Sequence, residues 1–258
     1  MIPSAVTTLK ARLYLEAVLP CLTALVKHDP ASSLLIKQDP FSVEISCGGG
    51  YHGVALLDAS SSDRSNLPNI HLHLPTAAQC VNLFTQSGFA LPIPLKGWTH
   101  FGRMRDFKTL STRLQNLLQP DKAAMQDAEV VALHVHLSLR LAVSALVPML
   151  EYDPEGITTR ASLPKAVAEF LYRPDRYGAL WLDLRGPRPV MGSGEPPERA
   201  RVTLEFCNDP TAILAMSNQL DGLAALGRGD LKLSGFVPMA DGLDLVMSRI
   251  QAYISPSA

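Results

Sequence analysis

Apolar residues along this chain follow patterns typical of both helices and strands. Residues 7–27 and 131–143 are rich in Leu, Ala and Val, yet their apolar positions also alternate with a period of two. Alternation is typical of a half-buried strand, but strands rarely reach about 20 residues. We therefore predict two helices, with strands at residues 9–21 and 131–143 as the alternative. We expect Pro20 and Pro148 to bend or end these helices.

Shorter alternating segments predict a β-sheet in each half. Residues 41–47 alternate, three glycines follow and apolar residues return at 54–57, which is a hairpin signature. Further strands are predicted over residues 70–74, 179–184, 201–206 and 231–234. Short helices are predicted over residues 77–84 and from Pro210, with Asp209 as the N-cap. Residues 89–101 are expected to be irregular or extended, the segment between the second long helix and residue 179 to be irregular, and residues 186–197 to form a loop with a flexible Gly192–Glu195 connector. Residues 155–175 have no convincing match in the first half.

Each half ends in a helix with one apolar stripe. Residues 104–118 carry the first stripe and residues 243–254 carry the second. Such a stripe packs against a core or lines a pocket. Burying a Leu or Ile contributes about 1.5–3 kcal/mol in either place, so the sequence leaves both interpretations open.

The two halves repeat one pattern of residues. The positions that recur at one constant offset are Leu9, Leu13, Leu15, Asp29 and Pro30, which return as Leu133, Leu137, Leu139, Asp153 and Pro154. Residues 112–115 match residues 248–251 at a longer offset. A repeat of long period predicts two copies of one domain. We place these copies at residues 1–121 and 122–258, with a linker near Pro120.

Composition narrows the choice of function. The formal net charge of −1 leaves no electrostatic footprint for nucleic acid. The charged fraction is 18%, below the usual value of about 25%, which indicates additional apolar surface. With no apolar run of about 18 residues and no N-terminal signal pattern, we expect neither a transmembrane segment nor secretion. The cysteines form no Cys-x-x-Cys pair, so we expect free thiols in a reducing cytoplasm.

The segment Ala200–Ile254 combines a short motif with a fixed order of elements. A strand and a helix are followed by Gly229-Asp230-Leu231-Lys232-Leu233-Ser234-Gly235 and then by an apolar helix. This order resembles the sterol carrier protein type 2 family, in which a Gly-x-Leu-Lys-Ile/Leu-x-Gly strand precedes a closing helix. The corresponding segment of the first copy, residues 97–102, keeps the flanking glycines but lacks the Asp and Lys.

The resemblance implies an α+β fold with two sterol-carrier-like domains. Each would be a twisted, mainly antiparallel sheet covered by helices, with an apolar tunnel for a lipid or acyl chain and no catalytic residues. Residues 1–121 would be the divergent copy and residues 122–258 the clearer copy. The residues expected to line the tunnels are Leu243, Val246, Met247, Ile250 and Ile254, and, in the first copy, Phe107, Leu110, Leu114 and Leu118.

Candidate catalytic or metal-binding chemistry is sparse. His71 and His73 share one face of a predicted strand, but no third ligand is nearby, so we favour a solvated polar face. His134 and His136 lie about 200° apart on a helix and could share a metal only on a strand. No nucleophile elbow, His-Glu-x-x-His or P-loop occurs, so we expect neither metal nor cofactor.

Charged residues are mostly explained by ordinary structural roles. The cations Arg103, Arg105 and Lys108 could contact an anionic head group, although a solvated helix N-terminus is the favoured interpretation. The carboxylates expected to serve as caps and in turns are Asp221, Asp230, Asp241 and Asp244.

Two hypotheses follow for function. The first is a cytoplasmic, non-enzymatic protein that binds or carries a lipid, sterol or acyl chain in an apolar tunnel. The second is a scaffold with filled cavities that forms a homodimer or binds a partner enzyme through its apolar surface. An enzyme is the least supported alternative, because no nucleophile–base pair can be placed.

Overall fold

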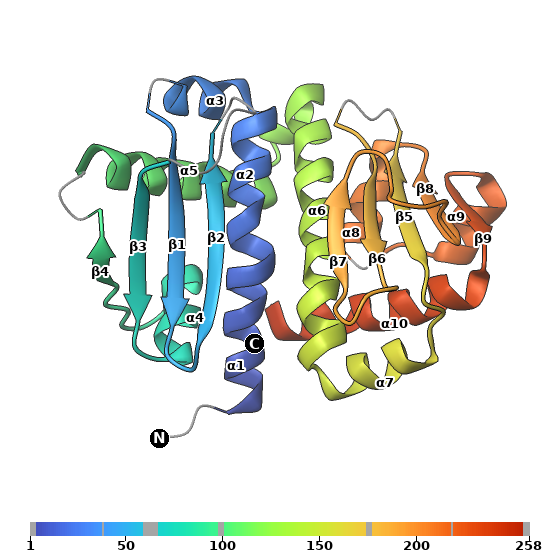
Figure 1. Ribbon diagram of the computed structural model, residues 1–258. Coiled ribbons are helices and arrows are strands. Elements are labelled where there is room, and N and C mark those ends of the chain that lie inside the picture. Colours follow the sequence, from blue (N-terminus) through green and yellow to red (C-terminus); the bar gives the residue numbers. More distant parts are fainter. Residues whose placement is uncertain are drawn as a thin grey trace. The chain divides into compact units, whose positions relative to one another are not determined.

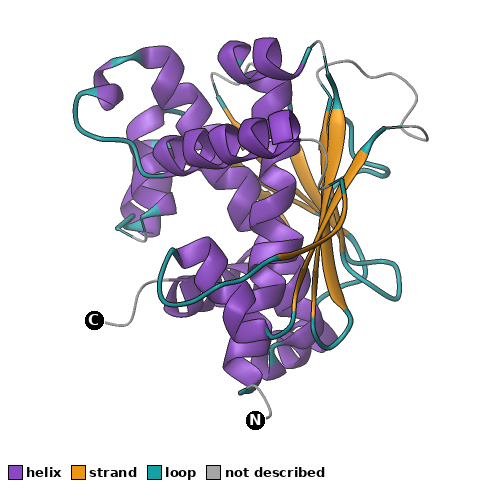
Figure 2. Cartoon of the chain, turned by 90° about the vertical axis from the view of Figure 1, so that its left-hand side faces the viewer, coloured by secondary structure: helices purple, strands orange, loops and turns teal. Residues whose placement is uncertain are grey.

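The computed structural model divides into two compact units, residues 1–121 and 122–258 (Figure 1). The residues that it describes are 4–37, 39–58, 67–97, 101–173, 177–217 and 219–254, with the side chains at 251, 252 and 254 outside the description. Helices accompany a mixed sheet in each unit, so the predicted α+β class is confirmed. In each unit the helices cover one face of the sheet (Figure 2).

The N-terminal unit begins with one long helical rod, which consists of α1 (Ala5–Leu13), a π-helical turn (Tyr14–Val18) and α2 (Leu19–His28). The other helices of this unit are α3 (Pro30–Ile36), α4 (Ala77–Thr85) and α5 (Phe101–Leu118). Its strands are β1 (Phe41–Cys47), β2 (Tyr51–Leu57), β3 (Asn69–Leu74) and β4 (Ile93–Lys96). The predicted hairpin, the strand at 70–74 and the helix at 77–84 are therefore present.

The C-terminal unit follows the same plan with more elements. Its helices are a 3-10 turn (Ala124–Gln126), α6 (Ala128–Tyr152), α7 (Pro154–Ser162), α8 (Asp209–Met216), α9 (Gly222–Arg228) and α10 (Val237–Ile254). Its strands are β5 (Val167–Tyr172), β6 (Leu180–Asp183), β7 (Val190–Ser193), β8 (Val202–Phe206) and β9 (Leu231–Gly235). Strands β5 and β7 lie where irregular structure was predicted, so those two predictions are wrong.

The two sheets share one pattern of strand pairing. The order is β2-β1-β3-β4 in the first and β7-β6-β5-β8-β9 in the second. Strand β1 pairs antiparallel with β2 and parallel with β3, and β3 pairs antiparallel with β4. In the same way, β5 pairs antiparallel with β6 and parallel with β8, and β8 pairs antiparallel with β9. The segment without a match in the first half thus contains α7 and β5, in the places of α3 and β1.

The two segments with ambiguous alternation are helices, as predicted. Leu9, Leu13 and Leu15 are buried together with Tyr14, so the apolar surface extends around most of the rod. Pro20 does not end the rod, because a π-turn precedes it and the Leu19 N–H bonds the Tyr14 carbonyl. A π-turn is one way to accommodate a disturbed helical ladder.

Helix α6 is the counterpart of this rod in the C-terminal unit. Pro148 lies inside it and does not end it, because the helix continues to Tyr152. Among the described residues α6 alone is long and apolar enough to cross a membrane by length and composition. Since 67% of that window is buried in the fold, it resembles the core helix of a globular protein.

A buried carboxylate joins the first helices of each unit to its closing helix. Asp29 caps α3, and the Arg113 guanidinium of α5 donates two hydrogen bonds of 3.2 Å to it. Asp153 caps α7, and the Arg249 guanidinium of α10 donates bonds of 3.1 and 3.2 Å. The residues that recur in the sequence are therefore partners in space, once in each unit.

Candidate functional site: the open apolar edge of each sheet

The second sheet has an apolar face that its helices cover unevenly. Strand register places Phe170, Leu204 and Leu233 in one row across β5, β8 and β9. Phe170 is 1% exposed, whereas Leu204 and Leu233 are only half-buried. Phe170 belongs to the core, so this row faces the helical layer. The helices cover the row less completely toward the edge of the sheet.

A second row shows the same gradient. Tyr172 and Phe206 are buried, and Leu231 beside them on β9 is half-buried. The opposite face of these strands is polar, since Glu205 pairs with Arg173 at 2.8 Å and with Lys232 at 3.7 Å. The open apolar residues are therefore on the inner face and are not part of an ordinary solvated surface.

Three helices flank this strip, which we call the β8–β9 strip (Leu204, Leu231 and Leu233). Helices α8 and α10 pack on β8, and α9 packs on β9. These elements and the β9–α10 turn expose large apolar side chains. The exposed residues are Leu214, Leu223, Leu226, Phe236, Val237 and Leu245. Since large exposed apolar side chains often mark a binding surface, the strip and the elements that flank it are a candidate ligand site.

The predicted tunnel-lining residues of α10 fall into two groups. Leu243, Val246 and Ile250 are buried, and Met247 is half-buried on the flank of the stripe away from Arg249. The side chain of Ile254 lies outside the described residues. Helix α10 packs on α6, α7 and β8, so its stripe belongs to the layer that covers the sheet.

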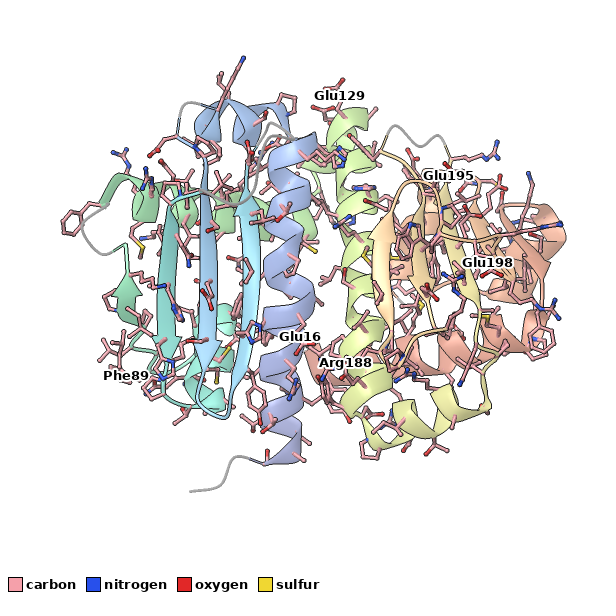
Figure 3. The ribbon with its side chains drawn as sticks, viewed as in Figure 1. Glu16, Phe89, Glu129, Arg188, Glu195 and Glu198 are labelled. Carbon is pink, nitrogen blue, oxygen red and sulfur yellow. The ribbon has the colours of Figure 1, made fainter. Side chains whose placement is uncertain are left out.

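The first unit has a related edge. Strand β4 is exposed along its length, and Ile93 and Leu95 are 42% and 52% exposed. Phe89, labelled in Figure 3, is 69% exposed in the segment that precedes β4. Of the predicted lining residues, Leu110 and Leu114 are buried, and Phe107 and Leu118 are half-buried. Helix α5 packs on α2 and α3.

The outer face of the first sheet carries a polar cluster. His71 and His73 face the same side, as predicted, and both bond the Ser46 hydroxyl, at 2.7 and 3.0 Å. Glu44 lies 3.8 Å from His71 and accepts a bond from Asn69. Across the described residues no group of three or more His, Cys, Asp or Glu is arranged to hold a metal ion.

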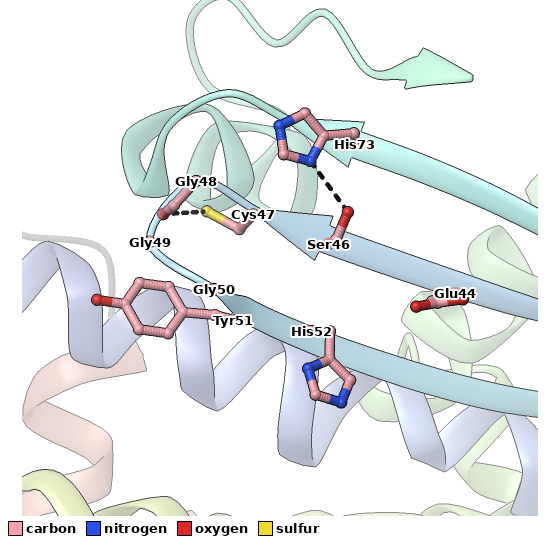
Figure 4. A pocket seen from close by; sticks show the side chains of 9 residues that line it. All are labelled: Glu44, Ser46, Cys47, Gly48, Gly49, Gly50, Tyr51, His52 and His73. Atoms are coloured by element: carbon pink, nitrogen blue, oxygen red, sulfur yellow. Dashed lines mark hydrogen bonds between the residues drawn. The ribbon is translucent and has the colours of Figure 1, made fainter. Parts of the chain in front are cut away.

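A pocket opens next to this cluster, at the β1–β2 turn (Figure 4). Glu44, Ser46, Cys47, the three glycines Gly48–Gly50, Tyr51, His52 and His73 line it. The Arg12 guanidinium stacks over the Tyr51 ring, 4.2 Å from its centroid. This pocket could not be predicted from the sequence, because its walls come from three strands that meet only through the sheet register.

Other charged and glycine-rich segments have structural partners. Arg103 pairs with Asp39 at 2.7 Å, so it is held by a carboxylate of its own unit. Asp221 caps α9, as expected, but Asp241 and Asp244 lie inside α10, so the prediction that they serve as caps or in turns is wrong. The Gly192–Glu195 connector predicted to be flexible begins inside strand β7, where Gly192 pairs with Trp181.

The fold and the β8–β9 strip together define an α+β protein whose helical layer leaves part of the apolar sheet face accessible. No family model matches the sequence, and no curated protein matches it significantly. Solved structures do match. One is the sterol carrier protein domain 2 of Helicoverpa armigera, with 15% identity and a TM-score of 0.36 over 46% of this chain and 93% of that chain.

Two further structures show the range of the likeness. Sterol carrier protein 2 from Yarrowia lipolytica has 19% identity and a TM-score of 0.34, over 43% of this chain and 91% of that chain. The inverting sec-alkylsulfatase Pisa1 from Pseudomonas sp. has 15% identity and a TM-score of 0.26, over 57% of this chain and 28% of that chain. Sterol carrier domains are thus among the solved structures to which this chain is similar.

Proposed function

We propose that this chain is a non-enzymatic, cytoplasmic carrier that binds the apolar part of a lipid, a sterol or an acyl chain. It would consist of two sterol-carrier-like domains, residues 1–121 and 122–258, with the main ligand site at the β8–β9 strip. The sterol carrier structures described above carry this function in their names, and it is transferred here as a proposal.

One observation supports the proposal above the others. Leu204, Leu231 and Leu233 point toward the helical layer, yet that layer leaves them half open. An apolar chain that covers them removes apolar surface from water on both sides. Each buried methylene contributes about 0.8 kcal/mol, so eight would contribute about 6 kcal/mol before the cost of association.

The closing helix would form the other wall of this site. Met247 is half-buried and flexible, which suits a side chain that adapts to ligands of different shape. Leu243, Val246 and Ile250 would line the site only if a ligand reached beneath α10. In the first unit, Phe107 and Leu118 would serve in the same way beside β4, with Leu110 and Leu114 behind them.

Fatty-acid displacement tests the proposal on the full chain. A fluorescent fatty acid bound to the protein should be displaced by unlabelled oleate, and native mass spectra should show the added mass. Leu233→Lys places a cation in the strip and should weaken binding at least about tenfold, which corresponds to about 1.4 kcal/mol. Ser234→Lys is the matched control, because Ser234 is exposed on the polar face of the same strand.

Two results would contradict the proposal. One is the absence of any uptake of oleate or cholesterol by the wild-type protein. The other is equal binding by Leu233→Lys and Ser234→Lys, which would place the ligand elsewhere. Edge strands tolerate lysine well, so both variants should remain folded, and circular dichroism checks this.

The second candidate function is a scaffold, and the exposed side chains around the strip favour it as well. Leu223 and Leu245, 84% and 55% exposed, would then be covered by a second copy or by a partner enzyme. Sedimentation velocity distinguishes the two functions. A ligand-free dimer that Leu223→Lys converts to monomer would support the scaffold, and a monomer that takes up lipid would support the carrier.

A further inference from the structure

Two cysteines that are far apart in the sequence meet beneath the pocket of the first unit. Cys47 is the last residue of β1 and lies opposite Leu74, the last residue of β3. The chain then turns, and Thr76 caps α4, so that Cys80 lies in the first part of that helix. The ends of two parallel strands and the start of one helix thereby bring the cysteines together.

Gly48 makes this approach possible. Its N–H donates to the Leu74 carbonyl at 2.8 Å, and a Cβ on this residue would lie 2.0 Å from the Pro75 carbonyl oxygen. No side chain fits there, so the end of β1 can lie directly against the turn that leads into α4. Backbone packing therefore brings the two cysteine residues close together.

The two thiols lie close enough to affect each other's pKa, and they differ in their surroundings. Both are buried, but Cys47 lines the pocket of Figure 4 and donates to the Gly48 carbonyl at 3.6 Å. The hydrogen bond from Cys80 holds the pKa of Cys47 below its usual value. The same bond, together with burial, raises the pKa of Cys80. Cys47 is thus the more acidic thiol and the one nearer to solvent.

We propose that Cys47 and Cys80 form a redox-active dithiol that hydrogen peroxide oxidises to an intramolecular disulfide. The Cys47 thiolate attacks one peroxide oxygen, the O–O bond breaks, and the departing hydroxide takes up a proton to become water. Cys47 is then a sulfenic acid. The Cys80 sulfur attacks the Cys47 sulfur, the S–O bond breaks, and the hydroxyl leaves with the Cys80 proton as a second water.

In this step the two thiols lose two electrons and the peroxide gains them. Cys47 lines the pocket whereas Cys80 does not, so a peroxide that enters the pocket reaches Cys47 first, and reactivity follows thiolate character and access. Cys80 resolves the sulfenic acid because it is already in contact. The bond would fasten the end of β1 to α4, and a dithiol reductant would reverse it.

Peptide mapping of the full chain tests the proposal. The protein is treated with hydrogen peroxide, its free thiols are alkylated, and it is digested with trypsin without reduction. Cleavage after Lys37, Arg64 and Lys96 places Cys47 and Cys80 in separate peptides, residues 38–64 and 65–96. We expect these two peptides to be joined and to separate after dithiothreitol, with Cys21 and Cys207 still alkylated.

Matched variants assign the two roles. Cys80→Ser should leave a sulfenic acid on Cys47 that dimedone traps, whereas Cys47→Ser should give no adduct on Cys80. Cys21→Ser is the control, because Cys21 is buried in α2 and should leave the joined peptides unchanged. The proposal would be overturned by wild-type protein without joined peptides, or by oxidation confined to the half-exposed Cys207. The wild-type map does not depend on whether a variant folds.

Discussion

The pair of Asp153 and Arg249 should be the strongest single polar contribution to the stability of the C-terminal unit. Asp153 is fully buried and accepts from the Gly156 N–H at 2.9 Å, from Arg249, and from the Tyr253 hydroxyl at 2.7 Å. Arg249→Met keeps most of the side-chain volume and removes the charge. The carboxylate would then remain buried without its cation.

The expected cost follows from the surroundings of both partners. Removing one member of a buried ion pair usually costs about 3–5 kcal/mol. Arg249 is 28% exposed, and Gly156 and Tyr253 would still donate to the carboxylate, so we expect about 2–3 kcal/mol. Asp153→Asn keeps a capping oxygen but removes the charge. In the Asp153→Asn background, Arg249→Met should therefore lower the free energy of unfolding by at least about 1 kcal/mol less than it does in the wild-type protein.

Urea unfolding followed by tryptophan fluorescence provides the measurement. The chain has two tryptophans, so a Trp98→Phe background leaves Trp181, on β6, as the reporter of this unit. Burial raises the pKa of Asp153, but the hydrogen bonds from Arg249, Tyr253 and Gly156 together lower it below its usual value. A carboxyl group whose pKa is lowered by folding stabilises the folded state at pH values above its unfolded pKa of about 3.9. This stabilisation is lost as the pH falls through the pKa of the folded state.

The difference between wild type and Arg249→Met should therefore be largest near neutral pH and should narrow below about pH 4. A difference under about 0.5 kcal/mol at pH 7 would refute the reasoning, because such small effects are typical of exposed pairs. A difference that stays constant down to pH 3 would also refute it, because it would assign the effect to packing of the arginine stem.

Two other substitutions test the same structural account in the first unit. Arg113→Met should cost less than Arg249→Met in matched urea unfolding, because Arg113 is 43% exposed and water can replace it beside Asp29; an equal or larger cost would contradict this. Gly53→Ala should lower the melting temperature of the chain, because a Cβ at this position of β2 would lie 2.1 Å from the Leu15 carbonyl oxygen, and an unchanged melting curve would show that the backbone can relax.

Much of the fold could be predicted from pattern alone where one face of an element is buried. Strands β1, β3 and β8 and helices α4, α5 and α10 lie within a few residues of their predicted places. The long helices were ambiguous because they are apolar around most of their surface, and length decided correctly between helix and strand.

The missed elements depend on contacts that a single sequence does not display. In β5, Val167 and Ala168 are both buried, which breaks the alternation expected of a strand. In β7, Gly192 has low strand propensity, but it pairs with Trp181 of β6, and a Cβ there would collide with the indole. Pairing and packing in the folded state outweigh the local preference in both cases.

Helix starts show a different kind of error. Asn208, and not Asp209, caps α8, and Asp209 instead accepts a hydrogen bond from the Tyr172 hydroxyl. Both residue types cap helices well, so the choice depends on how β8 delivers the chain to the helix. The Asp-Pro pairs at Asp29 and Asp153 were visible as a repeat, yet they also mark the starts of α3 and α7.

The candidate site could be predicted only in part from the sequence, for a related reason. A stripe on α10 indicates which residues turn inward, but the openness of Leu204 and Leu233 depends on how far the helical layer extends over the sheet. No alternation of residues encodes that distance. The contact between Cys47 and Cys80 likewise depends on strand register and on the close approach at Gly48.

The position of the Asp153–Arg249 pair also bears on how a ligand could be admitted. Arg249 lies near the C-terminal end of α10, whereas Val237 and Leu245 in its first half are exposed. The ion pair holds one end of the helix to α7. Movement of the other end would leave the ion pair intact, but it would expose Met239, Ala240 and Leu243, which are buried there. A ligand that enters beneath α10 would therefore have to replace the apolar contacts of these side chains.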